Sequence, residues 1–446
     1  MRLKNLFSQL YLSNRFFALF GAVILLFSLS YPFSILFPLA LTTFVVAVAT
    51  VLVDVILLFN PKVEVKVRRR LPKIFSLGDA NVVKLELTNL SDRALKLTVI
   101  DELPFQFQKR DFQQEITLAT DENTTIAYQL TPFERGSYDF GAVNVFLETN
   151  FGLVQRRHRH DYEMSIPVYP SVLQMKKYSI LAFDRMTTQK GIKKIRRIGH
   201  SYEFEQIKNY VRGDDYRSIN WKATSRRNEL MVNQFEDERA QQVYCIIDKS
   251  RAMKMPFEGL SLMDYAINTS LTISNIALQK HDKAGLITFS DKIGTTLKAE
   301  RKGNQLNKIL HSLYNEKERN LEANYELLYQ VARRLINGRS LILLYTNFES
   351  SYALERVLPI LRRINKLHVL VVVFFENTEI RNFVEDKVTT VEGIYTQTVA
   401  QNFLAEKTAM VQQLRQYGIQ AVLTRPEDLS VNTINKYLEL KSRGLI

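Results

Sequence analysis

The chain has 446 residues, of which 46% are hydrophobic and 24% are charged, and its formal net charge is +14 at pH 7. A chain of this length has room for two or three domains and a substantial core, and its composition excludes a largely disordered protein. The single cysteine, Cys245, excludes an intrachain disulfide, which fits a reducing compartment. Its apolar neighbours indicate a small buried side chain.

The apolar residues concentrate near the N-terminus, within residues 1–60. Residues Phe16 to Phe59 contain a single charge, Asp54, over 44 positions. One membrane helix needs about 20 apolar residues, so this stretch predicts two membrane helices joined by a tight turn. A cleaved signal peptide has one short apolar core and does not fit. The expected helices and the prolines that mark the turn are Phe16–Ser34, Leu39–Phe59, Pro32 and Pro38.

Basic residues flank this stretch on both sides. By the positive-inside rule, both of its ends and everything after it are expected in the cytoplasm. Asp54 lies within two turns of the expected membrane boundary, so we expect it to face the interface rather than to serve a function in the membrane. The basic residues are Arg2, Lys4 and Arg15 before the stretch and Lys62, Lys66, Arg68, Arg69, Arg70 and Lys73 after it.

A second basic region, Lys176 to Arg197, contains eight basic residues and one acidic residue, Asp184. We expect this region to be an exposed connector between two soluble domains. Together with the basic residues that follow the apolar stretch, it predicts a surface that favours anionic lipid head groups. Nucleic acid is the competing interpretation of such charge, and it is less favoured because no nucleic-acid-binding motif accompanies the charge.

Residues 61–170 are expected to form an antiparallel β-sandwich. Short runs of alternating apolar and polar residues are separated by turn residues, which is typical of such a domain. Nothing in this region indicates catalysis. His158, His160 and Asp161 could be considered as metal ligands, but they lie in a basic stretch, and a solvated turn is the favoured interpretation. The expected strands are 63–67, 81–89, 94–102, 115–119, 124–130 and 141–149.

Residues 241–446 are expected to form a doubly wound α/β domain. Runs dense in valine, isoleucine and leucine alternate with helical patterns, which predicts a parallel sheet covered on both faces. Residues 171–240 hold the basic connector and a polar segment with the only tryptophan, Trp221. The expected strands are 243–248, 284–290, 340–348, 368–375 and 420–424, and the expected helices are Leu262–Lys280, Asn304–Asn315, Tyr325–Ile336, Leu354–Asn365 and Val399–Tyr417.

The polar segment from Gly199 to Phe235 resembles a known family. The resemblance is to the signature of the bacterial domain-of-unknown-function fifty-eight family, and it is carried by Glu203-Phe204 and Tyr210-Val211-Arg212-Gly213-Asp214-Asp215-Tyr216-Arg217-Ser218-Ile219-Asn220-Trp221. The strand that ends at Asp248-Lys249-Ser250 matches the place where that family continues into a von Willebrand factor A-like domain. Upstream motifs that share the resemblance are Pro132-Phe133-Glu134-Arg135-Gly136, Asn150-Phe151-Gly152-Leu153 and Val168-Tyr169-Pro170.

This resemblance covers nearly the whole chain, including the two-helix anchor. It implies a multi-pass protein of the bacterial inner membrane, with two membrane helices and the bulk of the chain in the cytoplasm. It also implies a gene that is often found near those of MoxR-type AAA+ ATPases. The family has no established catalytic activity.

The charged residues of the signature admit two interpretations. Two arginines and two aspartates surround Gly213, which permits a sharp turn. An arginine fork can pair with a carboxylate, or its face can stack on Trp221 or Tyr216. The favoured interpretation is a polar clasp that fastens the segment to the sheet, because compensating charges need no external ligand. The alternative is a partner-docking surface made of Glu203, Phe204, Tyr210, Arg212, Gly213, Asp214, Asp215, Arg217 and Trp221.

The end of strand 243–248 resembles a degenerate metal site. An A-like domain normally binds Mg²⁺ through Asp-x-Ser-x-Ser, a threonine, and an aspartate after a later strand. Here Asp248 and Ser250 are present, but Ala252 replaces the second serine and Asn347 stands where the aspartate is expected. The sequence shows no clear equivalent of the threonine, and basic residues flank Ser250. A hard cation needs several oxygen ligands, so we expect a metal-free pseudo-site in which Asp248 pairs with a lysine or an arginine.

The sequence therefore predicts a membrane-anchored, non-enzymatic interaction or assembly factor without a cofactor, which acts with a MoxR-type AAA+ ATPase on other proteins. The alternative is a divalent-cation-dependent, adhesion-type protein-binding module. A third hypothesis is a hydrolase that uses Asp248 and Ser250. It has little support, because no glycine-rich phosphate loop, Gly-x-Ser-x-Gly elbow or His-Glu-x-x-His motif occurs in the sequence.

Overall fold

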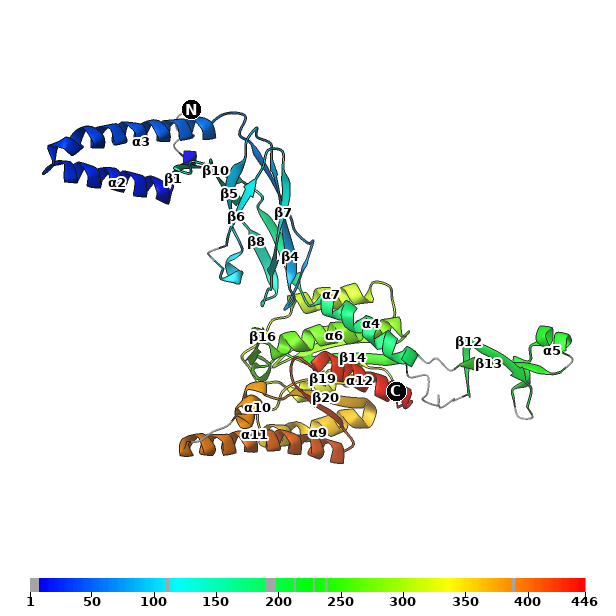
Figure 1. The fold of residues 1–446 in the computed structure, drawn as a ribbon. Coiled ribbons are helices and arrows are strands. Elements are labelled where there is room, and N and C mark those ends of the chain that lie inside the picture. Colours follow the sequence, from blue (N-terminus) through cyan, green and yellow to red (C-terminus); the bar gives the residue numbers. More distant parts are fainter. Residues whose placement is uncertain are drawn as a thin grey trace. The chain divides into compact units, whose positions relative to one another are not determined.

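The computed structural model describes residues 8–109, 112–188, 198–211, 214–227, 229–236, 240–386 and 390–445. The chain divides into two compact units, Met1–Tyr169 and Pro170–Ile446 (Figure 1). Each unit has hydrophobic clusters of its own. Each therefore buries apolar side chains without help from the other.

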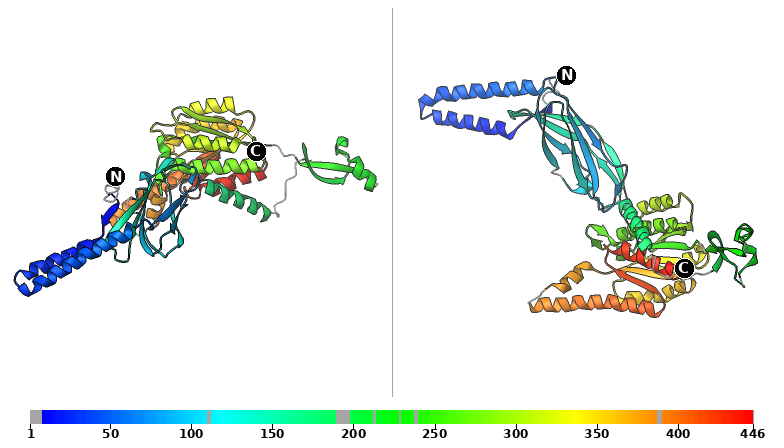
Figure 2. Two further views of the ribbon diagram at one scale, coloured as in Figure 1. Left: turned by 90° about the horizontal axis from the view of Figure 1, so that it is seen from above. Right: turned by 45° about the vertical axis from the view of Figure 1, so that its right-hand side comes forward.

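The first unit begins with a helical hairpin, whose helices α2 (Asn14–Ser30) and α3 (Phe37–Leu58) run side by side (Figure 2). The side chain of Ser13 caps α2 by accepting a backbone N–H of its first turn. Pro38 lies in the first turn of α3, where its missing N–H breaks no hydrogen bond. The expected helix boundaries differ from these by a few residues. The first helix was expected to end at Ser34 but ends at Ser30, and the second was expected to begin after Pro38 but contains it.

Among the described residues, α3 is the one helix that is long and apolar enough to cross a membrane. Helix α2 is also apolar but shorter, with 17 residues. Aromatic side chains join the two helices, because the ring of Phe44 lies 6.5 Å from that of Phe20 and 6.2 Å from that of Phe27. The described residues thus include one candidate membrane helix near the N-terminus, packed against a shorter apolar helix.

The sequence predicted that Asp54 of α3 faces the membrane interface. This prediction was wrong, because the side chain of Asp54 is buried and 0% exposed. Its Oδ2 accepts the backbone N–H groups of Leu153 and Val154, both at 3.0 Å. Its Oδ1 accepts the hydroxyl of Thr149. A buried carboxylate needs donors, and these three donors meet it where α3 passes the loop before strand β10. The prediction failed because these donors lie about a hundred residues further along the chain.

The rest of the first unit consists of mostly antiparallel sheets with the strand orders β1-β10-β9-β5-β6, β2-β4-β7 and β3-β11-β8. Alternate residues of β4, among them Val83, Leu85 and Leu87, are buried, as a half-buried strand requires. Side chains from the first two of these sheets pack together in one hydrophobic core. The strands are β1 (Leu10–Leu12), β2 (Val65–Arg70), β3 (Phe75–Ser76), β4 (Asn81–Asn89), β5 (Leu95–Asp101), β6 (Gln113–Leu118), β7 (Asn123–Leu130), β8 (Gly136–Phe140), β9 (Val143–Glu148), β10 (Val154–His160) and β11 (Met164–Tyr169).

The two histidines that were expected in a solvated turn lie in strand β10 instead. His158 and His160 pair with Val145 and Val143 of β9. Both side chains are partly buried, and this burial lowers their pKa values, for His158 to about 4. They are therefore neutral sheet residues at physiological pH. The sequence misled here because their strand is rich in arginine and histidine rather than in the usual apolar residues.

The second unit is built on a six-stranded sheet with the order β18-β17-β14-β19-β20-β21. Its strands are parallel except for β18, which pairs with β17 in the antiparallel direction at one edge. The prediction of a parallel sheet therefore holds for five strands, and β18 was missed. The six strands are β14 (Gln242–Asp248), β17 (Lys283–Phe289), β18 (Ile293–Glu300), β19 (Leu341–Tyr345), β20 (Val369–Phe375) and β21 (Gln420–Thr424). Two short strands, β15 (Pro256–Phe257) and β16 (Leu260–Ser261), pair with each other in a separate sheet.

Helices cover both faces of this sheet (Figure 1). Alternate residues of β14 enter different cores, with Cys245 in one and Ile246 in the other. The core of Cys245 is shared with α4, α6, α7 and α12, and the core of Ile246 with α8, α9 and α11. The helices are α4 (Val172–Thr188), α6 (Leu262–Gln279), α7 (Gln305–Asn315), α8 (Tyr325–Leu335), α9 (Ser351–Leu367), α10 (Thr378–Glu385), α11 (Val391–Gln416) and α12 (Leu429–Ser442).

The basic region that was expected to be an exposed connector begins as helix α4, which packs on α6. The side chain of Asn275 donates to the hydroxyl of Ser179 at 2.8 Å, and Ser171 donates its N–H to Asn268 at 2.8 Å. The connector prediction was therefore wrong for the start of this region. Its remainder, residues 189–197, lies outside the described residues.

Candidate functional site

The carboxyl edge of the central sheet brings two of the predicted site residues to neighbouring strands. Strand β14 ends at Asp248, and strand β19, which pairs with it in parallel, ends just before Thr346 and Asn347. This edge is where open α/β sheets place ligands. It is the natural starting point for a site.

Both oxygens of the Asp248 carboxylate already accept hydrogen bonds from the chain. Oδ1 accepts the N–H of Ser250 at 2.8 Å, and Oδ2 accepts the hydroxyl of Thr346 at 2.7 Å. The hydroxyl of Tyr325 lies 2.6 Å from that of Thr346. Burial raises the pKa of Asp248 above its ordinary value, although these hydrogen bonds oppose the shift. The prediction that Asp248 pairs with a lysine or an arginine was wrong.

The two basic neighbours of Ser250 bind other carboxylates. Lys249 Nζ lies 2.6 Å from Glu316 Oε2, and both side chains are nearly buried. Glu316 Oε1 accepts the hydroxyl of Thr288 at 2.8 Å. Although burial opposes it, hydrogen bonding to Lys249 holds the pKa of Glu316 below its ordinary value. Arg251 pairs with Glu322 at 3.2 Å on the surface.

Asn347 is bound to a lysine that the sequence did not suggest. Lys407 of α11 places its Nζ 3.2 Å from Asn347 Oδ1, and it also donates to the carbonyl of Phe348. The amide of Asn347 donates to the carbonyl of Ala252 at 3.3 Å. Burial lowers the pKa of Lys407 to about 8. An ammonium group therefore stands beside the residue that replaces the expected metal-binding aspartate.

These residues do not fit a divalent cation. The oxygens of Asp248 are occupied by donors, Ala252 supplies no side-chain oxygen, and Asn347 is neutral and bound to Lys407. Elsewhere in the described ranges, no group of three or more His, Cys, Asp or Glu side chains is placed to hold a metal ion.

The signature segment folds as a two-stranded ribbon that carries a short helix. Strands β12 (Ile198–Asn209) and β13 (Met231–Glu236) are antiparallel, and α5 (Trp221–Arg227) lies between them in sequence (Figure 1). Glu203 and Phe204 pair through their backbones with Glu236 and Phe235. Two predicted site residues, Arg212 and Gly213, lie outside the described residues.

The described charges of the signature bind within the segment, but not as the clasp hypothesis required. Asp214 accepts from Lys208 at 2.9 Å and from the N–H of Val211 at 3.0 Å. Asp215 caps a short turn by accepting the N–H of Arg217 at 3.0 Å. Neither aspartate forms an ion pair with Arg217 in the described part of the chain. The clasp hypothesis was therefore wrong for Arg217.

Two aromatic residues of the signature, Tyr216 and Trp221, are open to solvent. Tyr216 and Trp221 are both 69% exposed, and the guanidinium of Arg217 lies 5.7 Å from the centre of the Tyr216 ring. Tyr210 is half-buried and donates its N–H to the carbonyl of Leu230 at 2.7 Å. Exposed large aromatic side chains next to an arginine are typical of the anchor residues of protein interfaces.

Residues 206–381, which include Tyr210–Trp221 of the signature as well as Asp248 and Asn347, match the family model described as "Protein of unknown function DUF58". The match supports a DUF58 assignment for this part of the chain. The chain is also similar to the "Uncharacterized protein YeaD" of Bacillus subtilis (strain 168), with 26% identity over 125 residues. That match spans 28% of this chain and 31% of the relative's own length.

Solved structures resemble parts of this chain only distantly. BatB from Bacteroides thetaiotaomicron is 14% identical with a TM-score of 0.29, over 44% of this chain and 99% of that one. The CARDB domain of the PF1109 protein from Pyrococcus furiosus is 12% identical with a TM-score of 0.19, over 24% of this chain and 90% of that one.

We expect millimolar Mg²⁺ or Mn²⁺ to leave the melting temperature of the fragment Pro170–Ile446 unchanged. A cation that bound the folded state at a hundred times its Kd would stabilise it by about 2.7 kcal/mol, which a thermal melt detects easily. The fragment contains both cores of the second unit. Differential scanning fluorimetry with and without the metals makes the measurement.

The matched control is the double variant Ala252→Ser and Asn347→Asp, which restores a hydroxyl and a carboxylate. This variant should gain a metal-dependent rise in melting temperature. A rise in the unmodified fragment that disappears in Asp248→Ala would contradict the prediction and would favour the adhesion-type alternative.

Proposed function

We propose that this protein is a membrane-anchored, non-enzymatic interaction or assembly factor. It would dock a MoxR-type AAA+ ATPase through the signature segment and act with that ATPase on other proteins. The observation that carries the proposal is the exposure of Tyr216 and Trp221 beside Arg217. If the segment served only as a clasp, its two large aromatic side chains would have no reason to be exposed to solvent. Exposed apolar surface of this kind is typical of a protein-binding site.

The second unit has the role of a scaffold in this proposal. Its parallel strands, with helices on both faces, suit a von Willebrand factor A-like domain, in which partners bind at the carboxyl edge of the sheet. The internal hydrogen bonds of Asp248 and the contact of Lys407 with Asn347 support a metal-free form of that domain. They weigh against the cation-dependent adhesion module.

The hairpin α2–α3 is the membrane anchor in this proposal. Its apolar length supports insertion into a bilayer, and the basic residues that flank it support a cytoplasmic location for both of its ends. A hairpin enters and leaves on one side, so both soluble units would lie in the cytoplasm, at the inner membrane of a bacterial cell.

Trp221→Ala, alone or with Arg217→Ala, should abolish recovery of the AAA+ ATPase while leaving the protein folded. Both side chains are exposed, so their removal should change the free energy of unfolding by only about 0.5 kcal/mol. Removal of a central aromatic anchor from an interface typically costs about 2 kcal/mol or more of binding free energy. The measurement is affinity purification from detergent-solubilised membranes, followed by mass spectrometry.

The matched control is Tyr352→Ala, which removes an aromatic ring of α9 that is 77% exposed. The ATPase should be recovered with the wild type and this control, but not with the signature variants. Equal recovery with all proteins would show that the signature does not dock the partner, and a lower melting temperature of Arg217→Ala would revive the clasp hypothesis.

A further inference from the structure

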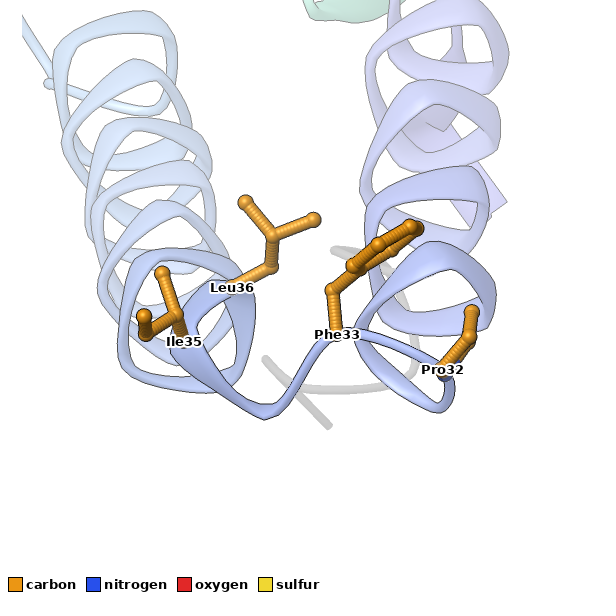
Figure 3. Close-up of a pocket in the computed structure, with 4 residues that line it drawn as sticks. All are labelled: Pro32, Phe33, Ile35 and Leu36. Atoms are coloured by element: carbon orange, nitrogen blue, oxygen red, sulfur yellow. The ribbon is translucent and has the colours of Figure 1, made fainter.

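Exposed apolar side chains gather at the tip of the α2–α3 hairpin, where Phe33 and Leu36 point toward the space between the two helix ends. With Pro32 and Ile35 they line a shallow apolar hollow (Figure 3). This tip belongs to the hairpin that is proposed as the membrane anchor. Another group of exposed apolar side chains lies on α11 of the second unit, outside that anchor, and the function proposed above gives it no role.

This second group lies on one side of the N-terminal half of α11, and we call it the α11 stripe. Val391, Tyr395, Val399 and Phe403 follow one another at intervals of four residues, and Ile394 lies beside them. Residues at this spacing share one side of a helix. Val391 is 86% and Tyr395 is 73% exposed, and the other three residues are between 39% and 52% exposed. The helix therefore presents a continuous apolar side to solvent.

Other sides of α11 are covered by protein. Near its C-terminal end, Leu414 is buried in one core of the second unit. In its N-terminal half, the side-chain amide of Gln397 donates to the carbonyl of Val384 of α10 at 2.7 Å. Gln397 lies about 200° around the helix from Tyr395. Helix α10 therefore packs on the side opposite to the stripe and leaves the stripe itself open (Figure 1).

The surroundings of the α11 stripe are acidic, although the whole chain has a net charge of +14. Glu392 is exposed and lies three residues before Tyr395, so both side chains share one side of the helix. Arg381 is not available to balance this charge, because its Nε donates to Glu376 at 2.7 Å. Between residues 376 and 406, the acidic residues are Glu376, Glu379, Glu385, Asp386, Glu392 and Glu406, and the basic residues are Arg381 and Lys387.

This charge decides what kind of molecule fits the stripe. Two copies of the stripe packed against each other would bring like carboxylates together, which disfavours self-association. Anionic head groups and nucleic acid would be repelled in the same way. A helix with an apolar side and basic residues along its flank is complementary in both respects. From Val391 to Phe403 the stripe extends about 18 Å, which matches about three turns of such a helix.

The C-terminal end of the stripe reaches the candidate site at the carboxyl edge of the sheet. Glu406, three residues after Phe403, accepts the N–H of Ser351 at 2.6 Å. The next residue, Lys407, contacts Asn347 Oδ1 at 3.2 Å. Consecutive residues of α11 thus connect the stripe with the residues that replace the metal site.

We propose that the α11 stripe binds a helix of another protein, about three turns long, whose apolar side packs on Tyr395 and whose lysine or arginine residues face Glu392. This surface does not include the signature segment. The inference therefore goes beyond the function proposed above and does not depend on the docking of an ATPase.

The test is a titration of the full chain, reconstituted in nanodiscs of zwitterionic lipid, with two fluorescent peptides of about 14 residues. The lysine probe is a helix with leucine on one side and lysine on the other, and the glutamate probe has every lysine replaced by glutamate. Fluorescence anisotropy measures both affinities, and empty nanodiscs give the lipid background. The variants are Tyr395→Ala, Glu392→Lys and the control Leu367→Ala, which shortens a side chain of α9 that is 45% exposed.

The lysine probe should bind the wild type at least about tenfold more tightly than the glutamate probe. Tyr395→Ala should weaken its binding about tenfold, as the loss of a central aromatic anchor does. Glu392→Lys should weaken binding of the lysine probe about threefold and strengthen binding of the glutamate probe, because it reverses a charge at the rim. Leu367→Ala should bind both probes as the wild type does.

Equal affinity for the two probes, or unchanged binding to Tyr395→Ala, would overturn the proposal. Loss of binding in Trp221→Ala instead of Tyr395→Ala would move the binding to the signature and would also overturn it. The recovery of an ATPase through the signature is measured separately, so its failure leaves the result of this titration standing.

Photo-cross-linking in cells tests the same surface with natural partners. The photoreactive residue p-benzoylphenylalanine replaces Tyr395 in one variant and Leu367 in the control. Mass spectrometry of the cross-linked peptides should identify, for Tyr395 alone, a segment with helically spaced apolar residues and a net positive charge. Cross-links to lipid or to a second copy of this chain, or no more cross-linking than at Leu367, would contradict the proposal.

Discussion

Asp54→Ala should destabilise the first unit by about 3–5 kcal/mol, because it leaves three buried donors without an acceptor. These donors are the hydroxyl of Thr149 and the N–H groups of Leu153 and Val154. The measurement is thermal unfolding of the full chain in detergent. The full chain is needed because Leu58 and the residues of β1 belong to this unit.

Two controls separate the hydrogen bonds from the charge. Asp54→Asn keeps one acceptor oxygen and should cost less than Asp54→Ala. Thr149→Val removes a single donor and should cost about 1 kcal/mol. If Asp54→Ala unfolds at the wild-type temperature, the carboxylate does not hold the hairpin to the first unit.

Lys249→Met should destabilise the second unit by about 3–5 kcal/mol, because it leaves the carboxylate of Glu316 buried without its counter-charge. The intact pair joins Lys249 Nζ and Glu316 Oε2 at 2.6 Å. The hydroxyl of Thr288 and the N–H of Thr295 add two further donors to that carboxylate. Urea unfolding of the fragment Pro170–Ile446 measures the loss.

The compensating variant is Lys249→Met with Glu316→Gln, which removes both charges and keeps an oxygen for Thr288. It should recover most of the lost free energy of unfolding. The pKa of Glu316 is lowered in the folded state, so its contribution is present above the ordinary value of 4.5 and is lost as pH falls through the lower, folded pKa. As pH falls from 4.5 through the folded pKa of Glu316, the free energy of unfolding should therefore decrease less in the Lys249→Met variant than in the wild type. Equal loss in both proteins would contradict the ion pair.

The sequence predicted the buried elements of the fold better than the exposed or polar ones. The strands that end at Asp248 and Phe375 are runs of β-branched and apolar residues, which few other structures accommodate. Strand β18 was missed because it lies at an edge of the sheet and has none of the long apolar runs of the central strands; its alternate residues Gly294, Thr296 and Lys298 are exposed. Helix α4 was missed because its charged residues were interpreted as an exposed connector, although one side of the helix packs on α6.

The candidate site could be located from the sequence but not completed. Asp248 and Ser250 were found because a buried strand ends in polar residues at the edge where ligands bind. Thr346, Tyr325 and Lys407 reach this edge from other elements, up to 159 residues further along the chain. Such partners come together only through the packing of helices on the sheet, which spacing along one chain does not reveal.

The signature segment is inserted between two elements that pack without it. Helix α4 contacts α6, and β14 lies between β17 and β19, while β12 pairs with β13 alone among the described strands. The entropy cost of closing a loop grows only with the logarithm of its length, by about 0.6 kcal/mol for each doubling. Mutation can therefore lengthen, shorten or exchange the residues between Thr188 and Gln242 at little cost to folding. Evolution can remodel this surface while the sheet beneath it stays the same.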